Sequence, residues 1–313
     1  MKTSRVLIIS SLILLASSLF FMLFNSNGNW DFILPFRGKK LLLLLTLAYT
    51  IGVSTLLFQT LTNNPILTPS ILGFDSLYLL LQTILVFLLG GLGFTQLPIA
   101  NKFAFETLLM LGAALLLFRT LTKDNADIAR MLLIGVVFGV FFRSVNNLLQ
   151  RMIDPEEFAV VQSSSFASFN NANPTLLTIG IIIALLSSIW IWIQRHKLDV
   201  LMLGKHKAIG LGINYNRFSH QLLICCALLV SVSTALVGPI LFLGLLVCAI
   251  VNAISPTMQH AIRIPLTFII SAITLVLGQA VFEQLFKLQG VLSVVIEFLG
   301  GIVFIYLMIK KQK

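Results

Sequence analysis

Long apolar runs separated by short polar connections make up most of this chain of 313 residues. Many of the runs are close to 20 residues long, the length of an α-helix that crosses a hydrocarbon core roughly 30 Å thick. Backbone polar groups in lipid must bond within their own segment, so these runs are predicted to be helices. Ten spans follow: 6–24, 40–61, 76–96, 103–121, 128–149, 175–194, 218–237, 240–254, 264–284 and 292–309. The sequence therefore predicts one all-α domain over residues 1–313, a polytopic transmembrane bundle of about ten helices.

The first and eighth runs differ from the others. The first follows Lys2 and Arg5, as the apolar part of a signal peptide does, but no small-x-small cleavage site follows Phe24, so we expect it to remain as a span. The eighth, about 15 residues long, is short for a core of this thickness and directly follows Gly238-Pro239, a pair that interrupts a helix. It either lines a path or forms a tight hairpin between packed helices, and both alternatives stay open.

Charge is scarce and is biased toward one side of the predicted bundle. Only 10% of the residues are charged, against about 25% in a soluble domain, and the net charge is +10. An even number of spans places both termini on one side, and a cytoplasmic N-terminus gives that side 14 of the 21 Lys and Arg residues, as the positive-inside rule requires. The membrane topology, rather than nucleic-acid binding, therefore explains the excess of basic over acidic residues. The 14 residues are Lys2, Arg5, Arg119, Lys123, Arg130, Arg195, Lys197, Lys205, Lys207, Arg217, Arg263, Lys310, Lys311 and Lys313.

A basic connection that also contains several apolar residues lies between the sixth and seventh predicted spans, at residues 195–217. Within it, the Asp199–Gly212 segment is predicted to form a short amphipathic helix with a glycine stop. This segment either docks a soluble motor or lies on the lipid headgroups as an interfacial helix. Its apolar residues are Leu201, Leu203, Ala208 and Leu211, its basic residues are Lys205 and Lys207, and its bounding glycines are Gly204 and Gly212.

Two polar stretches are predicted on the outer side. The first, 25–40, ends in the cations Arg37, Lys39 and Lys40. The second, 151–174, contains Asp154-Pro-Glu-Glu and a tract rich in Ser and Asn. Either stretch can meet a partner or a polar solute. Alternatively, the cations reach to lipid headgroups, and for the second stretch we favour a solvated loop.

Residues with the potential for catalysis or metal binding are few and scattered. The histidines are predicted in cytoplasmic loops or at span ends, without a carboxylate or Cys partner, which favours interfacial positions over metal ligation. The cysteines lie inside apolar runs and are expected to pack as small buried hydrophobic residues. Gly204-Lys205 lacks the upstream glycine of a phosphate loop, because residue 199 is Asp. These residues are His196, His206, His220 and His260, and Cys225, Cys226 and Cys248.

Three motifs resemble those of the permease family of iron-siderophore and vitamin B12 ABC importers. The first, Asn64-Pro-Ile-Leu-Thr-Pro-Ser-Ile-Leu-Gly73, resembles the family's signature loop between spans two and three. The second, Leu201-Met-Leu-Gly204 with Leu211-Gly212, is similar to its coupling loop, and the third, Gly238-Pro-Ile-Leu-Phe-Leu-Gly244, to its motif after span seven. The motif residues that the resemblance places on the translocation path are Asn64, Pro65, Pro69, Gly73, Gly238, Pro239 and Gly244.

The resemblance implies a function: the permease subunit of a type II ABC importer that carries a ferric siderophore across the bacterial cytoplasmic (inner) membrane. Asp154–Phe158 and Ser165–Asn170 look most similar to the subgroup for ferric catechol-type siderophores. The implied partners are ABC ATPase subunits that hold ATP and Mg, a second permease (identical or related), and a periplasmic siderophore-binding protein docked by Arg37 and Lys40. The chain itself is expected to bind no cofactor, metal or nucleic acid. The resemblance also implies that residues 195–217 form the coupling loop that contacts the ATPase.

Some alternatives remain beside the resemblance. The resemblance does not determine which chelate is transported, and vitamin B12 and haem are alternative cargoes. Near the outer end of span nine, where the family often has a basic residue, this chain has Glu283 and Lys287. An ion-coupled secondary transporter is a further alternative, but such a protein usually needs an ionisable group near the membrane midplane. The embedded ionisable residues predicted here lie near span ends: Glu106, Arg143, Glu283 and Glu297.

Overall fold

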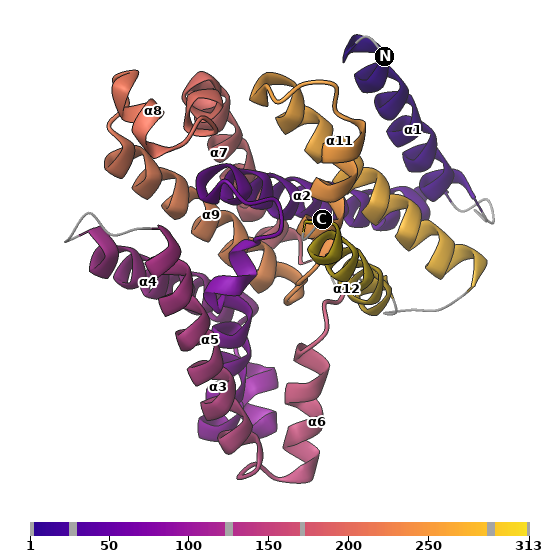
Figure 1. The fold of residues 1–313 in the computed structure, drawn as a ribbon. Helices are drawn as coiled ribbons and strands as arrows, with labels where there is room; N and C mark the ends of the chain where they lie inside the picture. The colour runs from indigo at the N-terminus through magenta and orange to yellow at the C-terminus, as the bar shows by residue number, and fades with distance from the viewer. Residues whose placement is uncertain (1–2, 25–29, 123–127, 170–172, 287–291, 312–313) are drawn as a thin grey trace.

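The computed structural model describes residues 3–24, 30–122, 128–169, 173–286 and 292–311, and helices account for nearly all of them. Four lysines that entered the predictions, Lys2, Lys123, Lys287 and Lys313, lie outside these residues. Each predicted span corresponds to one helix (Figure 1), which confirms the all-α bundle. These ten helices are α1 (Thr3–Leu23), α2 (Trp30–Thr62), α3 (Phe74–Gln96), α4 (Ile99–Thr122), α5 (Ile128–Gln150), α7 (Pro174–Leu201), α9 (Tyr215–Val237), α10 (Leu243–Ile254), α11 (His260–Ala280) and α12 (Leu292–Lys311).

Four shorter helical elements complete the described chain. They are η1 (Pro69–Leu72), α6 (Pro155–Ser164), α8 (Lys205–Gly210) and η2 (Val281–Leu285). In the described residues, eight helices are long and apolar enough to cross a membrane, and two further apolar helices are shorter. One of the two is α10, whose 12 residues reach only about 18 Å. The prediction of a short eighth helix is therefore confirmed.

Helix α2 is the centre of the bundle. It packs against α1, α7, α9, α10 and α11 (Figure 1). Its apolar residues point in all directions, as expected of a helix surrounded by others, and Leu44, Leu47 and Leu57 are fully buried. The helix begins at Trp30, ten residues before the predicted start at residue 40. Much of the polar stretch predicted at residues 25–40 is therefore helical.

Helices α3, α5 and α6 project together from one end of the bundle (Figure 1), and α3 packs against the other two. Pro155 occupies the first position of α6, where its missing N–H costs nothing. Helix α3 contains a break at Gly90, where φ is +72°. The Glu157 carboxylate of α6 accepts a hydrogen bond from the backbone N–H of Gly91 at 3.0 Å. The N–H exposed by the break is thus satisfied by a neighbouring helix.

The second polar stretch is more ordered than a solvated loop. It contains α6, and after α6 the side chains of Ala167 and Phe169 are each only 2% exposed. The backbone N–H of Ser168 donates to the carbonyl of Val237, at the end of α9, at 2.8 Å. The expectation of a solvated loop is therefore wrong for this part of the stretch.

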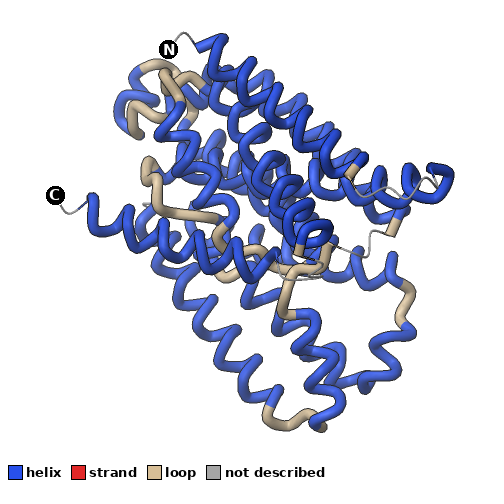
Figure 2. Tube along the Cα trace, turned by 90° about the vertical axis from the view of Figure 1, so that its right-hand side faces the viewer, coloured by secondary structure: helices blue, strands red, loops and turns tan. Residues whose placement is uncertain are grey.

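Viewed from the side, the described chain is a stack of helices joined by short loops (Figure 2). The three cysteines are free and buried in this packing, as expected: Cys225, Cys226 and Cys248. In the described part of the chain, no group of three or more His, Cys, Asp or Glu residues is placed to hold a metal ion.

Candidate functional site

The segment that joins α7 to α9 forms a short helix between two glycines, as predicted. Helix α7 continues to Leu201, so the first residues of the 195–217 connection are helical. Gly204 (φ +95°) precedes α8 and Gly212 (φ +83°) follows it. Both glycines adopt the left-handed backbone region that other residues rarely enter, so they fix the turns at the two ends of α8.

The apolar side chains of this segment divide into two groups. Leu201 and Ala208 are buried against their own chain, at 2% and 0% exposure. Leu203 and Leu211 are exposed, at 51% and 62%, together with Ile209. The expectation that all four predicted apolar residues face a partner is therefore wrong for Leu201 and Ala208, which instead anchor the segment.

The two lysines of the segment also differ. Lys207 is exposed, whereas Lys205 is partly buried and its Nζ lies 5.8 Å from the centre of the Tyr215 ring. Lys207 is thus placed beside the exposed apolar surface of Leu203, Ile209 and Leu211. An exposed cation next to exposed apolar side chains suits a protein surface with an acidic rim.

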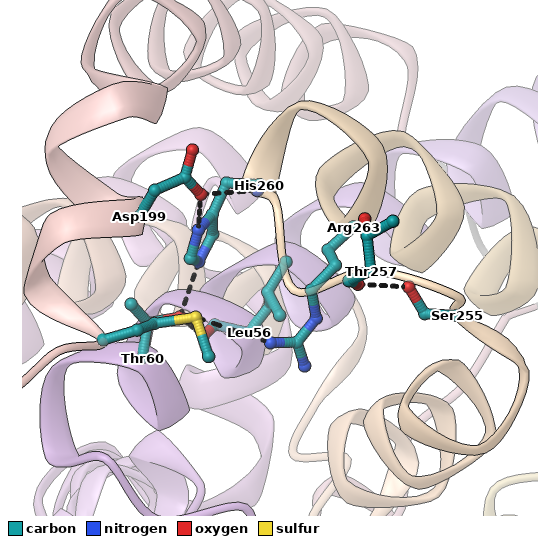
Figure 3. A network of polar contacts seen from close by, with 8 residues as sticks. Leu56, Thr60, Asp199, Ser255, Thr257, His260 and Arg263 are labelled. Carbon is teal, nitrogen blue, oxygen red and sulfur yellow. Dashed lines mark hydrogen bonds and ion pairs between the residues drawn. The ribbon is translucent and has the colours of Figure 1, made fainter. Parts of the chain in front are cut away.

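A polar network ties the end of α7 to α11 and α2 (Figure 3). One carboxylate oxygen of Asp199 accepts hydrogen bonds from the backbone N–H and from ring Nδ1 of His260, both at 2.7 Å. The other ring nitrogen, Nε2, lies 2.8 Å from the hydroxyl of Thr60 on α2. His260 is fully buried. The expectation that no histidine has a carboxylate partner is therefore wrong for His260, and Asp199 is bonded within the bundle rather than held out in water.

Arg263 lies one turn further along α11 (Figure 3) and extends the network to α10. Its guanidinium donates to the side-chain oxygen of Asn252 on α10 and to the sulfur of Met202, which lies at 3.8 Å. Met202 directly follows α7 and precedes α8. Side-chain bonds therefore connect the base of the exposed segment to three other helices, α2, α10 and α11.

Breaking this network is expected to destabilise the fold measurably. Hydrogen bonds to charged groups contribute about 1.5–3 kcal/mol, so Asp199→Ala and His260→Ala should each lower the free energy of unfolding by about that amount. The double variant should lose at least about 1 kcal/mol less than the sum, because the two residues share the bonds. Thermal unfolding in detergent measures all three. Asp199→Ala combined with His220→Ala is the control, and additive losses for Asp199 and His260 would contradict the coupling.

The first family-like motif folds back against α2 and then seats on α5. The Asn64 side chain accepts from the N–H of Ile66 at 3.2 Å, and the Pro65 carbonyl accepts from the Gln59 side chain at 2.7 Å. Pro69 starts η1, and Gly73 ends it with φ +88°. A β-carbon at Gly73 would lie 2.7 Å from Cα of Gly139 on α5, so only glycine fits this contact.

The third motif forms the break between α9 and α10. Gly238 adopts φ +101°, and a β-carbon there would lie 3.3 Å from Cα of Ala167. Pro239 follows and cannot continue the helix. Gly244 packs so closely on α2 that a β-carbon would overlap the Thr55 side chain. The glycines of both motifs therefore mark places where backbones approach closely.

A cavity of about 600 Å³ lies between the start of α4, the end of α9 and the link from α6 to α7. Lys102 and Glu106 of α4 line it, with Lys102 Nζ 3.9 Å from a Glu106 oxygen. That oxygen also accepts from the Gln82 side chain at 2.7 Å, and Glu106 is 1% exposed. One oxygen of this embedded carboxylate thus has two polar partners.

Comparison with known proteins agrees with these motifs. The model of the FecCD transport family matches residues 5–310. The chain belongs to the FecCD transport family. This FecCD protein is 48% identical over 295 residues to the petrobactin import system permease protein YclO of Bacillus subtilis, covering 93% of each chain. It is 34% identical to the permease protein FatC of Bacillus anthracis, also named for petrobactin import, over 83% of this chain and 74% of that protein.

The fold of the FecCD protein is also found among solved structures. An inward-facing candidate metal-chelate type ABC transporter superposes with a TM-score of 0.86 at 20% identity, covering 99% of this chain and all of the other. Family, fold and apolar helices together make the FecCD protein a multi-pass protein of the cytoplasmic membrane. The expected family is confirmed.

Two of the cations predicted on the outer side, Arg37 and Lys40, are engaged within the chain of the FecCD protein. The Arg37 guanidinium donates to the carbonyls of Phe21, Met22 and Phe24 at 3.2, 3.0 and 2.7 Å, at the end of α1. Lys40 is 4% exposed and pairs with Glu283 at 2.5 Å. The expectation of an exposed docking cation is therefore wrong for Lys40. Glu283, which departs from the family pattern, is the partner of Lys40, and the neighbouring Lys39 is exposed.

One buried residue of the FecCD protein was missed by the sequence reasoning. Asp75 lies in the first turn of α3, directly after Gly73 and Phe74, and is 6% exposed. It was assigned to a connection because the predicted third span began at residue 76. The available signal was a carboxylate two residues after the signature glycine, inside an otherwise apolar sequence.

Proposed function

We propose that this FecCD protein is the membrane permease subunit of an ABC importer that brings a ferric siderophore of the petrobactin class into the cytoplasm. The observation that carries the proposal is 48% identity to a petrobactin import permease along 93% of both chains. The exposed apolar surface of Leu203, Ile209 and Leu211 supports it, because a subunit driven by a separate ATPase needs a surface on which that ATPase can act.

The proposed partners follow from this role. Two ABC ATPase subunits bind ATP and Mg, and a second permease, identical or related, completes a path wide enough for a large chelate. Closure of the ATPases pushes on α8 and its flanking residues. The force reaches α2, α10 and α11 and moves them as a rigid body. It is transmitted by the buried side chains of Leu201 and Ala208 and by the Asp199–His260 network.

The proposed outer partner is an extracytoplasmic siderophore-binding protein. Because Lys40 is buried and Arg37 bonds to the end of α1, the exposed cation offered by this part of α2 is Lys39. An exposed ion pair contributes about 0–1 kcal/mol and weakens with salt. Docking is therefore proposed to depend on several weak contacts rather than on a single one.

Reconstitution tests the proposed function. Membrane vesicles would contain this chain, its ATPase subunits and the binding protein, and radioactive iron in ferric petrobactin would report uptake. We expect uptake that requires ATP and stops when the ATPase is replaced by a hydrolysis-deficient variant. Uptake driven by an ion gradient without any ATPase would contradict the proposal, and preferred uptake of vitamin B12 or haem would change the cargo class.

A further inference from the structure

Two interruptions of the helical bundle meet at one small cavity. The first is η1, between α2 and α3, and the second is the Gly238-Pro239 break between α9 and α10. The cavity between them has a volume of about 20 Å³, which holds one particle the size of a water molecule. Its polar lining consists of Ser54 and Thr55 from α2, Ser70 from η1, Asp75 from α3, and Ser233 and Thr234 from α9.

Asp75 brings a buried carboxylate oxygen with no protein partner to this cavity. Its Oδ2 is fully buried and has no hydrogen bond among the described residues. A buried carboxylate left without a partner is costly, so such groups are normally paired. Asp75 lies in the first turn of α3, where the helix dipole favours the ionised form. Ser70 bonds to the Asp75 side chain, but Oδ2 keeps no partner among the residues described, so a cation bound in the cavity would compensate the ionised carboxylate.

The hydroxyl groups around Asp75 are largely restricted to accepting. Ser54 donates its hydroxyl hydrogen to the carbonyl of Ile51 at 3.1 Å, and Ser233 donates to Val230 at 2.9 Å. Each of these oxygens therefore has only acceptor capacity left. Of these three oxygens, Asp75 Oδ2 is the one without a hydrogen-bond partner in the described part of the chain. A cation in the cavity would be ligated by that oxygen together with the free lone pairs of both hydroxyls.

We propose that this cavity is a binding site for one sodium-sized monovalent cation, held by Asp75 with the hydroxyls of Ser54, Ser70 and Ser233. A single carboxylate balances a single positive charge, whereas calcium sites in proteins use several carboxylates and magnesium keeps most of its water. The last turn of α9 places the negative end of its dipole at the cavity. In secondary transporters, the ends of discontinuous helices coordinate sodium ions or protons in the same way.

Two other charged groups act on this site from neighbouring helices. Arg143 of α5 and Glu297 of α12 both interact electrostatically with Asp75. Arg143 does not line the cavity. Arg143 therefore moderates the negative charge without occupying the cavity, and Glu297 adds to the attraction for a cation.

Direct binding of radioactive sodium to the purified full-length chain in detergent tests the proposal. In choline chloride buffer we expect saturable binding of one sodium ion per chain, displaced by unlabelled sodium. Because the carboxylate is the charged ligand, Asp75→Asn should weaken binding by about 10-fold or more, and Ser233→Ala by a smaller factor. Glu106→Gln removes a different buried carboxylate and should leave binding unchanged.

Several outcomes would overturn the site. The first is that the wild-type chain shows no saturable sodium binding, and the second is that Asp75→Asn binds sodium as well as the wild type does. The third is a thermal stability that responds to pH but not to sodium, because this result would show a protonated Asp75 in an ion-free cavity. Gel filtration and circular dichroism establish that each variant is folded, and Ser233→Ala alone decides the matter if Asp75→Asn does not fold. The assay contains no ATPase and no binding protein, so its failure leaves the proposed transport function unaffected.

Discussion

Replacing Leu203 with aspartate is expected to abolish ATP-driven uptake while leaving the protein folded and inserted in the membrane. Leu203 is 51% exposed in the segment between α7 and α8, so the change disturbs no core packing. Burial of a leucine side chain against a partner contributes about 1.5–3 kcal/mol, and burial of a charge in its place adds a desolvation cost. Affinity for the ATPase should therefore fall by at least about 10–100-fold, as measured by co-purification and by uptake into vesicles.

Two matched variants define what this result means. Leu203→Met keeps an apolar side chain of similar volume and should retain both ATPase binding and transport. Lys207→Gln removes an exposed charge from the same surface and should mainly reduce the rate of association, most clearly at low salt. A Leu203→Asp protein that keeps its ATPase and transports at the wild-type rate would show that this surface rests on lipid headgroups instead.

The second large effect is expected at Gly73. Gly73→Ala forces alanine into a backbone conformation with φ +88° and drives its β-carbon to within 2.7 Å of the Gly139 backbone. The left-handed conformation costs about 1–2 kcal/mol, and the overlap adds about 1–3 kcal/mol because no side chain can move aside. We expect a loss of roughly 2–5 kcal/mol in unfolding free energy, with uptake reduced in proportion to the folded protein.

Two other glycines separate the causes of that loss. Gly212 also has a positive φ, +83°, and has open space around its missing β-carbon, so Gly212→Ala should show only the backbone cost of about 1–2 kcal/mol. Gly112 lies inside α4 with nothing near it, and Gly112→Ala should be neutral or stabilising by up to about 1 kcal/mol. If Gly73→Ala loses no more stability than Gly212→Ala, η1 is not tightly packed on α5.

The sequence predicted the ten apolar helices in the right order, and eight of them, among the described residues, are long and apolar enough to cross a membrane. Two boundaries were wrong for the same reason. Helix α2 starts at Trp30 and α7 runs to Leu201, although both contain charged residues that hydropathy assigns to loops. Two of those charged residues have partners on other elements: Lys40 pairs with Glu283, 243 residues away, and Asp199 with His260, 61 residues away.

The candidate site was predicted only as far as local chemistry allows. Gly204 and Gly212 could be predicted as turn positions, because a turn with positive φ favours glycine. Which leucines of the segment are buried depends on the rest of the bundle, and so Leu201 and Leu203 could not be told apart. The Asp199–His260 pair joins residues 61 positions apart, and no local pattern indicates such a contact.

The break at Gly90 divides α3 into two segments that meet at a kink. The later segment is bonded to α6, whereas the earlier segment begins next to η1, which packs on α5. Val86 before the break and Phe94 after it share an apolar cluster with Val161 of α6, so α6 contacts both segments. A displacement of α6 would therefore move both segments of α3 together.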